Sequence, residues 1–246
     1  MDTAPPRHPV LALWALPRTA STAFERMMIE RGDHTVVDEP FSLHYYFGAE
    51  KVSGRFAEVA PASRPPDIVA RLEDAAIRRP VFLKDMAYHV AAMATPRFMD
   101  RFVSTFLIRD PASALPSLAR KWPDFTSEET GYEAVARLVE LEEGRGRPVV
   151  VIDSDDLCRR PEDVVRAWCV RMGIDFVPRS MEWAAGMRPE WELWPDWYEA
   201  TARTTGFRPP VDRPAPTSHD PRLAAEHRRC LPIYRELRER RLCPTG

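Results

Sequence analysis

The sequence predicts a single α/β domain in which helices flank a central, mostly parallel five-stranded sheet. Short runs rich in β-branched and apolar residues alternate with longer segments of helical period, which is the pattern of a parallel sheet covered by helices. Several of the short runs are apolar throughout, as strands buried on both faces require. The chain of 246 residues is also long enough to give one such domain a sizeable core.

Five segments are predicted to be strands because each is a short run dominated by apolar or β-branched residues. They are residues 10–16, 34–38, 80–86, 103–109 and 148–153. The first helix should follow the first strand directly. Thr22 and Glu25 have the spacing of a capping box at its start, and Gly32 is placed for a left-handed C-terminal cap.

Two later helices have recognisable ends. Asp110 can cap a helix that carries Pro111 in its first turn, directly after the fourth strand. Pro161 opens a second helix after the fifth strand, and Gly173 ends it. Both helices therefore begin where a strand of the predicted sheet has just ended.

The C-terminal part of the chain is predicted to be a proline-rich extended loop over about 205–221 and a closing helix over about 221–242. The loop is unlike a domain boundary, because only about 25 residues follow it, too few for a second core. We therefore expect one domain over 1–246.

Composition excludes several functional classes. A formal charge of -2 leaves no excess of positive charge to hold a nucleic acid, so no nucleic-acid partner is expected. The apolar run near the N-terminus has only about seven residues, too short for a membrane span, and four widely spaced cysteines show no metal-ligand spacing. These features predict a cytoplasmic enzyme without a membrane partner or a metal site; they leave the oligomeric state open.

The first chemical motif is LWALPRTASTAF, residues 13–24, in which a buried strand turns through small residues into a helix. Backbone amides at a helix start and the helix dipole favour an anion, and Arg18, Ser21 and Thr22 add donors. The Walker pattern of glycines and lysine is missing. A second motif, LIRDPASALPSL, places Arg109 at a strand end and Ser117 eight residues later.

Taken together, the two motifs resemble those of the sulfotransferases that use 3′-phosphoadenosine 5′-phosphosulfate (PAPS). The resemblance implies a P-loop-like fold in which the phosphosulfate loop holds the donor; this loop corresponds to Arg18, Thr19, Ala20, Ser21, Thr22 and Ala23. It further implies that Arg109 and Ser117 bind the 3′-phosphate. Arg18 replaces the usual lysine, and Ala23 stands where cytosolic members carry an aromatic residue that stacks on adenine.

The third predicted strand ends in VFLKDMAYHV, similar to the family's lysine-containing strand, which implies that Lys84 lies near the bridging oxygen of the donor. The family's histidine two places later is replaced by Met86. Glu39, Asp85 and His89 are therefore the alternatives for the general base, and Glu39 is favoured because it follows a strand at the ligand-binding edge of the predicted sheet.

The resemblance implies direct in-line transfer of a sulfuryl group from PAPS to a hydroxyl or amine of a small-molecule acceptor. Arg18 and Lys84 would stabilise charge on the leaving phosphate. Two alternatives stay open: an ATP-dependent phosphotransferase of P-loop type, and a nucleotide-binding module of the same fold without catalytic activity. The sequence does not identify the acceptor.

Overall fold

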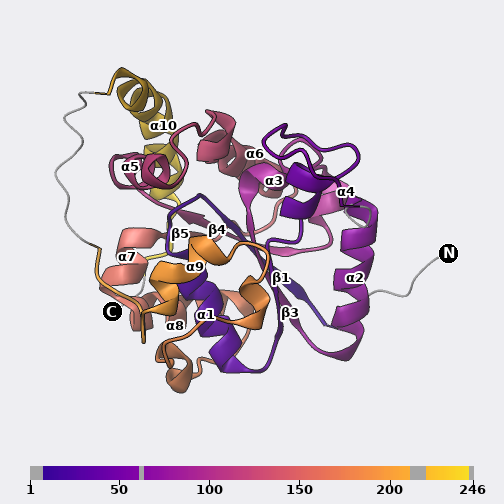
Figure 1. The fold of residues 1–246 in the computed structure, drawn as a ribbon. Helices are drawn as coiled ribbons and strands as arrows, with labels where there is room; N and C mark the ends of the chain where they lie inside the picture. Colours follow the sequence, from indigo (N-terminus) through magenta and orange to yellow (C-terminus); the bar gives the residue numbers. More distant parts are fainter. Residues whose placement is uncertain (1–7, 61–63, 211–219, 244–246) are drawn as a thin grey trace.

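The computed structural model describes residues 8–60, 64–210 and 220–243 of the chain. Five parallel strands form one sheet in the order β2-β3-β1-β4-β5, and helices cover both of its faces (Figure 1). The predicted fold class is confirmed. Because all strands run the same way, their carboxyl ends meet at one edge of the sheet, where ligands bind in folds of this kind.

All five predicted strands are present, each within a few residues of its expected bounds. They are β1 Val10–Ala15, β2 Thr35–Asp38, β3 Val81–Met86, β4 Val103–Ile108 and β5 Val151–Asp153. Strand β5 is the shortest relative to its prediction. Its expected first residue, Pro148, has no backbone N–H and cannot donate to a sheet ladder.

Ten α-helices connect and cover the strands within the described part of the chain. They are α1 Ser21–Arg31, α2 Pro65–Arg78, α3 Ala87–Val90, α4 Pro96–Met99, α5 Pro111–Lys121, α6 Tyr132–Gly144, α7 Ser154–Arg159, α8 Pro161–Met172, α9 Pro195–Ala202 and α10 Pro221–Glu239. The predicted closing helix is α10. Residues 211–219 of the predicted proline-rich loop lie outside the described residues.

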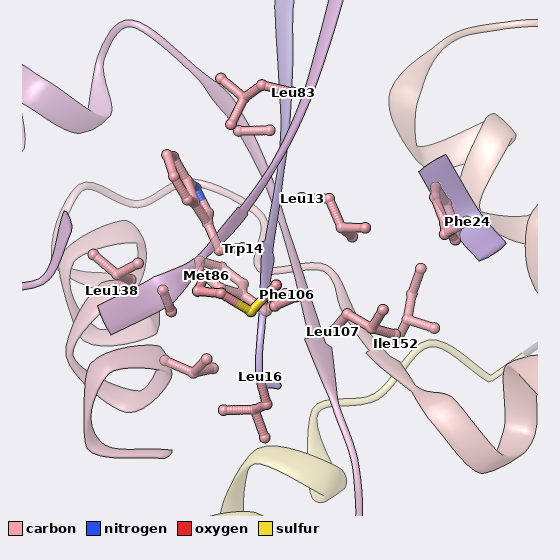
Figure 2. Packing of buried hydrophobic residues seen from close by; sticks show 14 of the residues in the cluster. Leu13, Trp14, Leu16, Phe24, Leu83, Met86, Phe106, Leu107, Leu138 and Ile152 are labelled. Atoms are coloured by element: carbon pink, nitrogen blue, oxygen red, sulfur yellow. The ribbon is translucent and has the colours of Figure 1, made fainter. Parts of the chain in front are cut away.

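The core divides into two layers on either side of the sheet. On the α1 face, Phe24 of α1 packs edge-on against Trp168 of α8, with ring centroids 4.9 Å apart. On the opposite face, Trp14 of β1 packs edge-on against Phe102 at 5.3 Å. Figure 2 shows Trp14 and Phe24 on opposite sides of the central strands. This division decides which residues of β3 can meet which helices.

Helix ends follow the local sequence signals, with one exception. Gly32 and Gly173 are left-handed caps, and the Asp110 side chain accepts from the Ala112 amide. The capping box predicted for α1 is wrong: Ala20 is the N-cap, and no side chain caps the helix. Glu25 is fully buried against the sheet, which prevents its return to the helix start.

None of the described helices has the length and apolar character that crossing a bilayer would require.

Candidate active site

The anion-binding loop joins β1 to α1 and has an unusual backbone. Arg18 and Ala20 adopt positive φ angles of 65° and 62°, which side-chain-bearing residues rarely adopt. This conformation turns the chain sharply into α1. Because no side chain caps α1, its first amides point into the loop without a side-chain acceptor. A helix start of this kind is suited to bind an anion.

Arg18, Arg109 and Ser117, the residues that the sequence selected for the donor, lie together, although Arg18 comes from the β1–α1 loop and the other two from the β4–α5 unit. The Arg18 Nε donates to the Ser117 Oγ at 3.0 Å, and the Arg109 Nη1 donates to the Arg18 carbonyl at 2.8 Å. Ser117 lies on α5, and Arg109 lies between β4 and that helix. The resulting cluster lies beside the loop at the carboxyl edge of the sheet.

This cluster is electrostatically suited to an anion. Burial lowers the pKa of Arg18, and repulsion from Arg109 lowers it further. Within the described residues, no carboxylate lies within ion-pair distance of Arg18. Arg109 approaches one acid, with its Nε 3.6 Å from the Asp155 Oδ1, but neither atom makes a hydrogen bond. Two neighbouring guanidinium groups with so little compensation attract an anion.

The remaining loop residues differ in their orientation. The Thr19 hydroxyl donates to the Leu16 carbonyl at 2.7 Å inside the protein, so this side chain supports the loop. Ser21 is buried and lines the neighbouring cavity, whereas Thr22 is half-buried. Ala20 and Ala23 contribute backbone and small side chains only. The loop therefore offers an anion its main-chain amides more than its hydroxyls.

Lys84 is surrounded by carboxylates and does not line the cavity that Arg18 and Ser21 line. Its Nζ is fully buried and lies 2.5 Å from the Asp38 Oδ1 and 2.6 Å from the Glu39 Oε1. A third carboxylate, Glu25 of α1, is 3.9 Å away. Burial alone would lower the pKa of Lys84, but the surrounding carboxylates outweigh it and hold the pKa well above its ordinary value.

The carboxylates around Lys84 outnumber it. Burial raises the pKa of Glu25 well above its ordinary value, and the charge of Asp38 raises it further. Burial also raises the pKa of Glu39, although Lys84 opposes that shift. Glu39 has a positive φ of 39°, so the backbone holds its carboxylate at the sheet edge in a strained conformation. The single ammonium thus holds both acids at the end of β2 but balances only one negative charge.

Asp85 follows Lys84 on β3 and therefore points to the other face of the sheet. Its Oδ2 accepts from the Phe41 amide at 2.7 Å, and its Oδ1 accepts from the Met86 amide at 2.8 Å. The same Oδ1 lies 2.6 Å from the His89 Nδ1. With Asp85 ionised, the His89 Nδ1 must donate in this contact, which leaves Nε2 as the acceptor of a neutral ring.

His89 lies in the interior, in contrast to an ordinary surface histidine beyond a strand. It is buried, yet it lines the same cavity as Ser21, and its Nε2 has no hydrogen-bond partner among the described residues. Burial lowers the pKa of His89 to about 4, which keeps the ring neutral. Met86, at the usual histidine position, lines the cavity with its thioether side chain.

The cavity beside the loop has a volume of about 50 Å³ and brings the polar groups together with aromatic walls. Its lining combines loop residues, two of the candidate bases and six aromatic side chains: Pro17, Arg18, Ser21, Glu39, Tyr46, Met86, Tyr88, His89, Leu118, Trp122, Trp194, Trp197 and Tyr198. Asp85 and Lys84 do not line it. Among the candidate bases, Glu39 and His89 reach this space, and Asp85 acts on it through His89.

Sequence reasoning did not select the residues of the aromatic wall. Trp194, Trp197 and Tyr198 all belong to the segment after α8: Trp194 directly precedes α9, and the other two lie on that helix. The Tyr198 hydroxyl donates to the Asp38 Oδ2 at 2.5 Å and lies 3.3 Å from the Lys84 Nζ. A cluster of five large aromatics over 183–198 was the available signal. Such clusters also occur in ordinary packing, so composition alone could not assign them.

Comparison with known proteins identifies the family of the chain. A model of the sulfotransferase domain family matches residues 10–241, and the chain therefore belongs to that family. Two solved structures share the fold at low sequence identity. They are the sulfotransferase domain of the Synechococcus PCC 7002 olefin synthase (TM-score 0.58, 17% identity, 97% of this chain and 96% of that chain) and the one from the curacin biosynthetic pathway (TM-score 0.53, 14% identity, 96% and 99%).

Two curated relatives from Arabidopsis thaliana carry different names. They are branched-chain-amino-acid aminotransferase-like proteins 2 and 1, which are 28% and 29% identical over 249 residues. These residues cover 93% of this chain and 41% of each relative. The chain thus spans less than half the length of the curated relatives that it matches.

Proposed function

We propose that the protein transfers a sulfuryl group from PAPS to the hydroxyl of a small-molecule acceptor. The observation that carries this proposal is the Arg18, Arg109 and Ser117 cluster beside the start of α1, which adjoins a cavity lined by an unpartnered histidine nitrogen. One site thus combines a phosphate cradle with a proton acceptor. Membership of the sulfotransferase family supports the same reaction.

The residues present fit the proposed donor. Arg109 and Ser117 would hold its 3′-phosphate, while Arg18 and the first amides of α1 would hold the phosphosulfate group. Bound there, PAPS would supply an activated sulfuryl group whose leaving group is a phosphate oxygen. The charge of Arg18 supports this fit, because a half-buried cation that has no carboxylate at ion-pair distance among the described residues favours an incoming anion.

His89 is the general base in this proposal, in place of Glu39, which the sequence favoured. The Glu39 carboxylate is paired with Lys84 at 2.6 Å, whereas the His89 Nε2 has no hydrogen-bond partner in the described ranges of the chain. As the acceptor oxygen bonds to sulfur, its proton passes to Nε2, and the sulfur–oxygen bond to the phosphate breaks. Asp85 holds the tautomer and stabilises the imidazolium, in the manner of the aspartate of a catalytic triad.

Lys84 has a positioning role in this proposal. Its ammonium holds Asp38, Glu39 and, through a 3.3 Å contact, the Tyr198 hydroxyl, and of these three residues Glu39 and Tyr198 line the cavity. Arg18 and the loop amides then stabilise the charge that develops on the leaving phosphate. The acceptor binds between this wall and His89, which places its hydroxyl near Nε2.

Nucleotide binding provides the direct test of the donor. Adenosine 3′,5′-bisphosphate without magnesium should raise the melting temperature by about 5 to 10 °C at a hundredfold excess over Kd. AMP, ADP and ATP should produce smaller shifts at equal concentration, because they lack the 3′-phosphate. Differential scanning fluorimetry measures all four. A larger shift with magnesium and ATP would instead favour a P-loop phosphotransferase, and an ATP-hydrolysis assay would verify it.

The pH dependence of turnover tests the base. Burial raises the pKa of Asp85 to about 7 and lowers that of His89. The two groups share a hydrogen bond, so they titrate as a pair, and the proton that distinguishes ionised Asp85 with neutral His89 from the protonated pair is lost in one macroscopic step near pH 7. Below that step the Nε2 cannot accept a proton. We expect kcat/KM to rise about tenfold per pH unit below pH 7 and to level off above it. A profile that is flat from pH 5 to 8 would contradict this role for the pair.

A further inference from the structure

The cavity beside His89 is too small for a whole acceptor. Its volume of about 50 Å³ has room for about three to five water molecules. A sulfuryl group and the hydroxyl-bearing carbon of an acceptor would fill it. The rest of the acceptor must therefore lie outside this space.

A second hollow lies on the other side of one wall of this cavity. It has a volume of about 350 Å³ and is lined by Phe56, Lys121, Trp122, Leu193, Trp194, Pro195, Asp196 and Trp197. Three of these residues, Trp122, Trp194 and Trp197, also line the inner cavity. The three half-buried tryptophans thus form a wall shared by the two spaces.

The tryptophans of this wall are held to different degrees. The Trp194 Nε1 donates to the Ser42 Oγ at 3.2 Å, and Arg55 stacks over Trp122 at 4.2 Å while pairing with buried Glu129. Trp197 meets Trp122 edge-on at 4.8 Å and lies 5.8 Å from the Arg18 guanidinium, but its indole N–H has no hydrogen-bond partner among the described residues. Of the three tryptophans, Trp197 is therefore the one whose side chain can move most readily when a ligand binds.

We infer that the acceptor is an elongated, unbranched apolar alcohol whose body lies in the outer hollow and whose hydroxyl end passes the tryptophan wall toward His89. This inference rests on the proposed function and adds the shape of its substrate. A narrow chain would displace the three tryptophans least, and the outer hollow would surround that chain with aromatic and aliphatic side chains beside Lys121 and Asp196. Trp197 is the residue that determines this specificity, because it lies between the outer hollow and the donor loop.

Alcohol binding tests the shape requirement without relying on transfer. With adenosine 3′,5′-bisphosphate bound, intrinsic tryptophan fluorescence gives the Kd of each alcohol. From n-butanol to n-octanol, we expect binding to tighten about fourfold per methylene. We expect n-pentanol to bind about tenfold tighter than its isomer neopentyl alcohol, which is branched beside the hydroxyl carbon.

Substitution of Trp197 provides the matched comparison. In Trp197→Ala the preference for n-pentanol should fall to about twofold or less, because the wall no longer excludes the branch. Trp197→Phe keeps an aromatic ring at this position and should retain most of the preference for n-pentanol over neopentyl alcohol. Thermal melts with the bisphosphate verify that both variants are folded and bind the donor product.

The outcomes separate this inference from the proposed function. The inference would be overturned if the native protein bound the two pentanol isomers equally, or if Kd did not depend on chain length. In that case, PAPS-dependent transfer to either alcohol would still support the proposed function. Conversely, the expected Kd pattern without transfer of labelled sulfuryl group to n-octanol would uphold the acceptor channel and count against the reaction.

Discussion

Replacing His89 by asparagine should lower turnover by about 10² to 10⁴ while leaving the Kd of adenosine 3′,5′-bisphosphate within about twofold of the native value. The asparagine amide can still donate to the Asp85 Oδ1, as the His89 Nδ1 does at 2.6 Å. It lacks Nε2, the atom that faces the acceptor. Single-turnover assays with PAPS, paired with calorimetry of the bisphosphate, separate the chemical step from donor binding.

Glu39→Gln is the matched comparison for this variant. Its amide keeps the shape of the side chain but cannot take a proton, and we expect it to retain more turnover than His89→Asn. Some loss is expected, because the Glu39 carboxylate balances Lys84 at 2.6 Å. If Glu39→Gln collapses and His89→Asn stays near native, the base is the carboxylate at the end of β2. Asp85→Asn should resemble His89→Asn, because it disturbs the tautomer.

Replacing Arg109 by alanine should weaken binding of adenosine 3′,5′-bisphosphate by about 1.5 to 3 kcal/mol, or about 10- to 150-fold. The loss should be much smaller for AMP, which has no 3′-phosphate. The physical reason is that Arg109 and Arg18 form a nearly uncompensated pair of cations whose ligand is a divalent anion. Calorimetry with the two nucleotides measures the difference.

Arg101→Ala is the control for the general effect of removing a guanidinium. Arg101 precedes β4, at the opposite edge of the sheet, where it pairs with Glu73. It should leave both affinities unchanged. An equal loss of bisphosphate and AMP affinity in Arg109→Ala would contradict the 3′-phosphate role, because it would mean that Arg109 supports the loop through its bond to the Arg18 carbonyl.

Some of the site could be predicted because its signals are local in the sequence. A loop such as the one from Arg18 to Thr22 is defined by a strand that runs directly into a helix. The placement of Arg109 and Ser117 on one strand–helix unit follows from their spacing across the start of α5. In such cases the backbone joins the residues within a single strand–turn–helix unit, so the chain itself fixes their relation.

Other parts of the site depend on which face of the sheet a residue occupies. Lys84 and Asp85 are neighbours in sequence, but the strand directs them to opposite faces. Lys84 therefore meets Glu25 and Asp38, whereas Asp85 meets His89. The spacing of these residues along the chain does not reveal this division, because it depends on how β3 pairs with β2 and β1.

The sequence by itself determined the α/β fold, the joint between β1 and α1 and the positions of Arg109 and Ser117 on either side of the start of α5, because periodicity and short-range spacing specify strands, helices and their joints. Only the tertiary structure decided that Lys84 is enclosed by acids, that the His89 Nε2 has no hydrogen-bond partner within the described part of the chain and that Trp197 lines the cavity beside the loop. Each of these depends on contacts between segments far apart in the chain, whose geometry is set by packing rather than by local propensity.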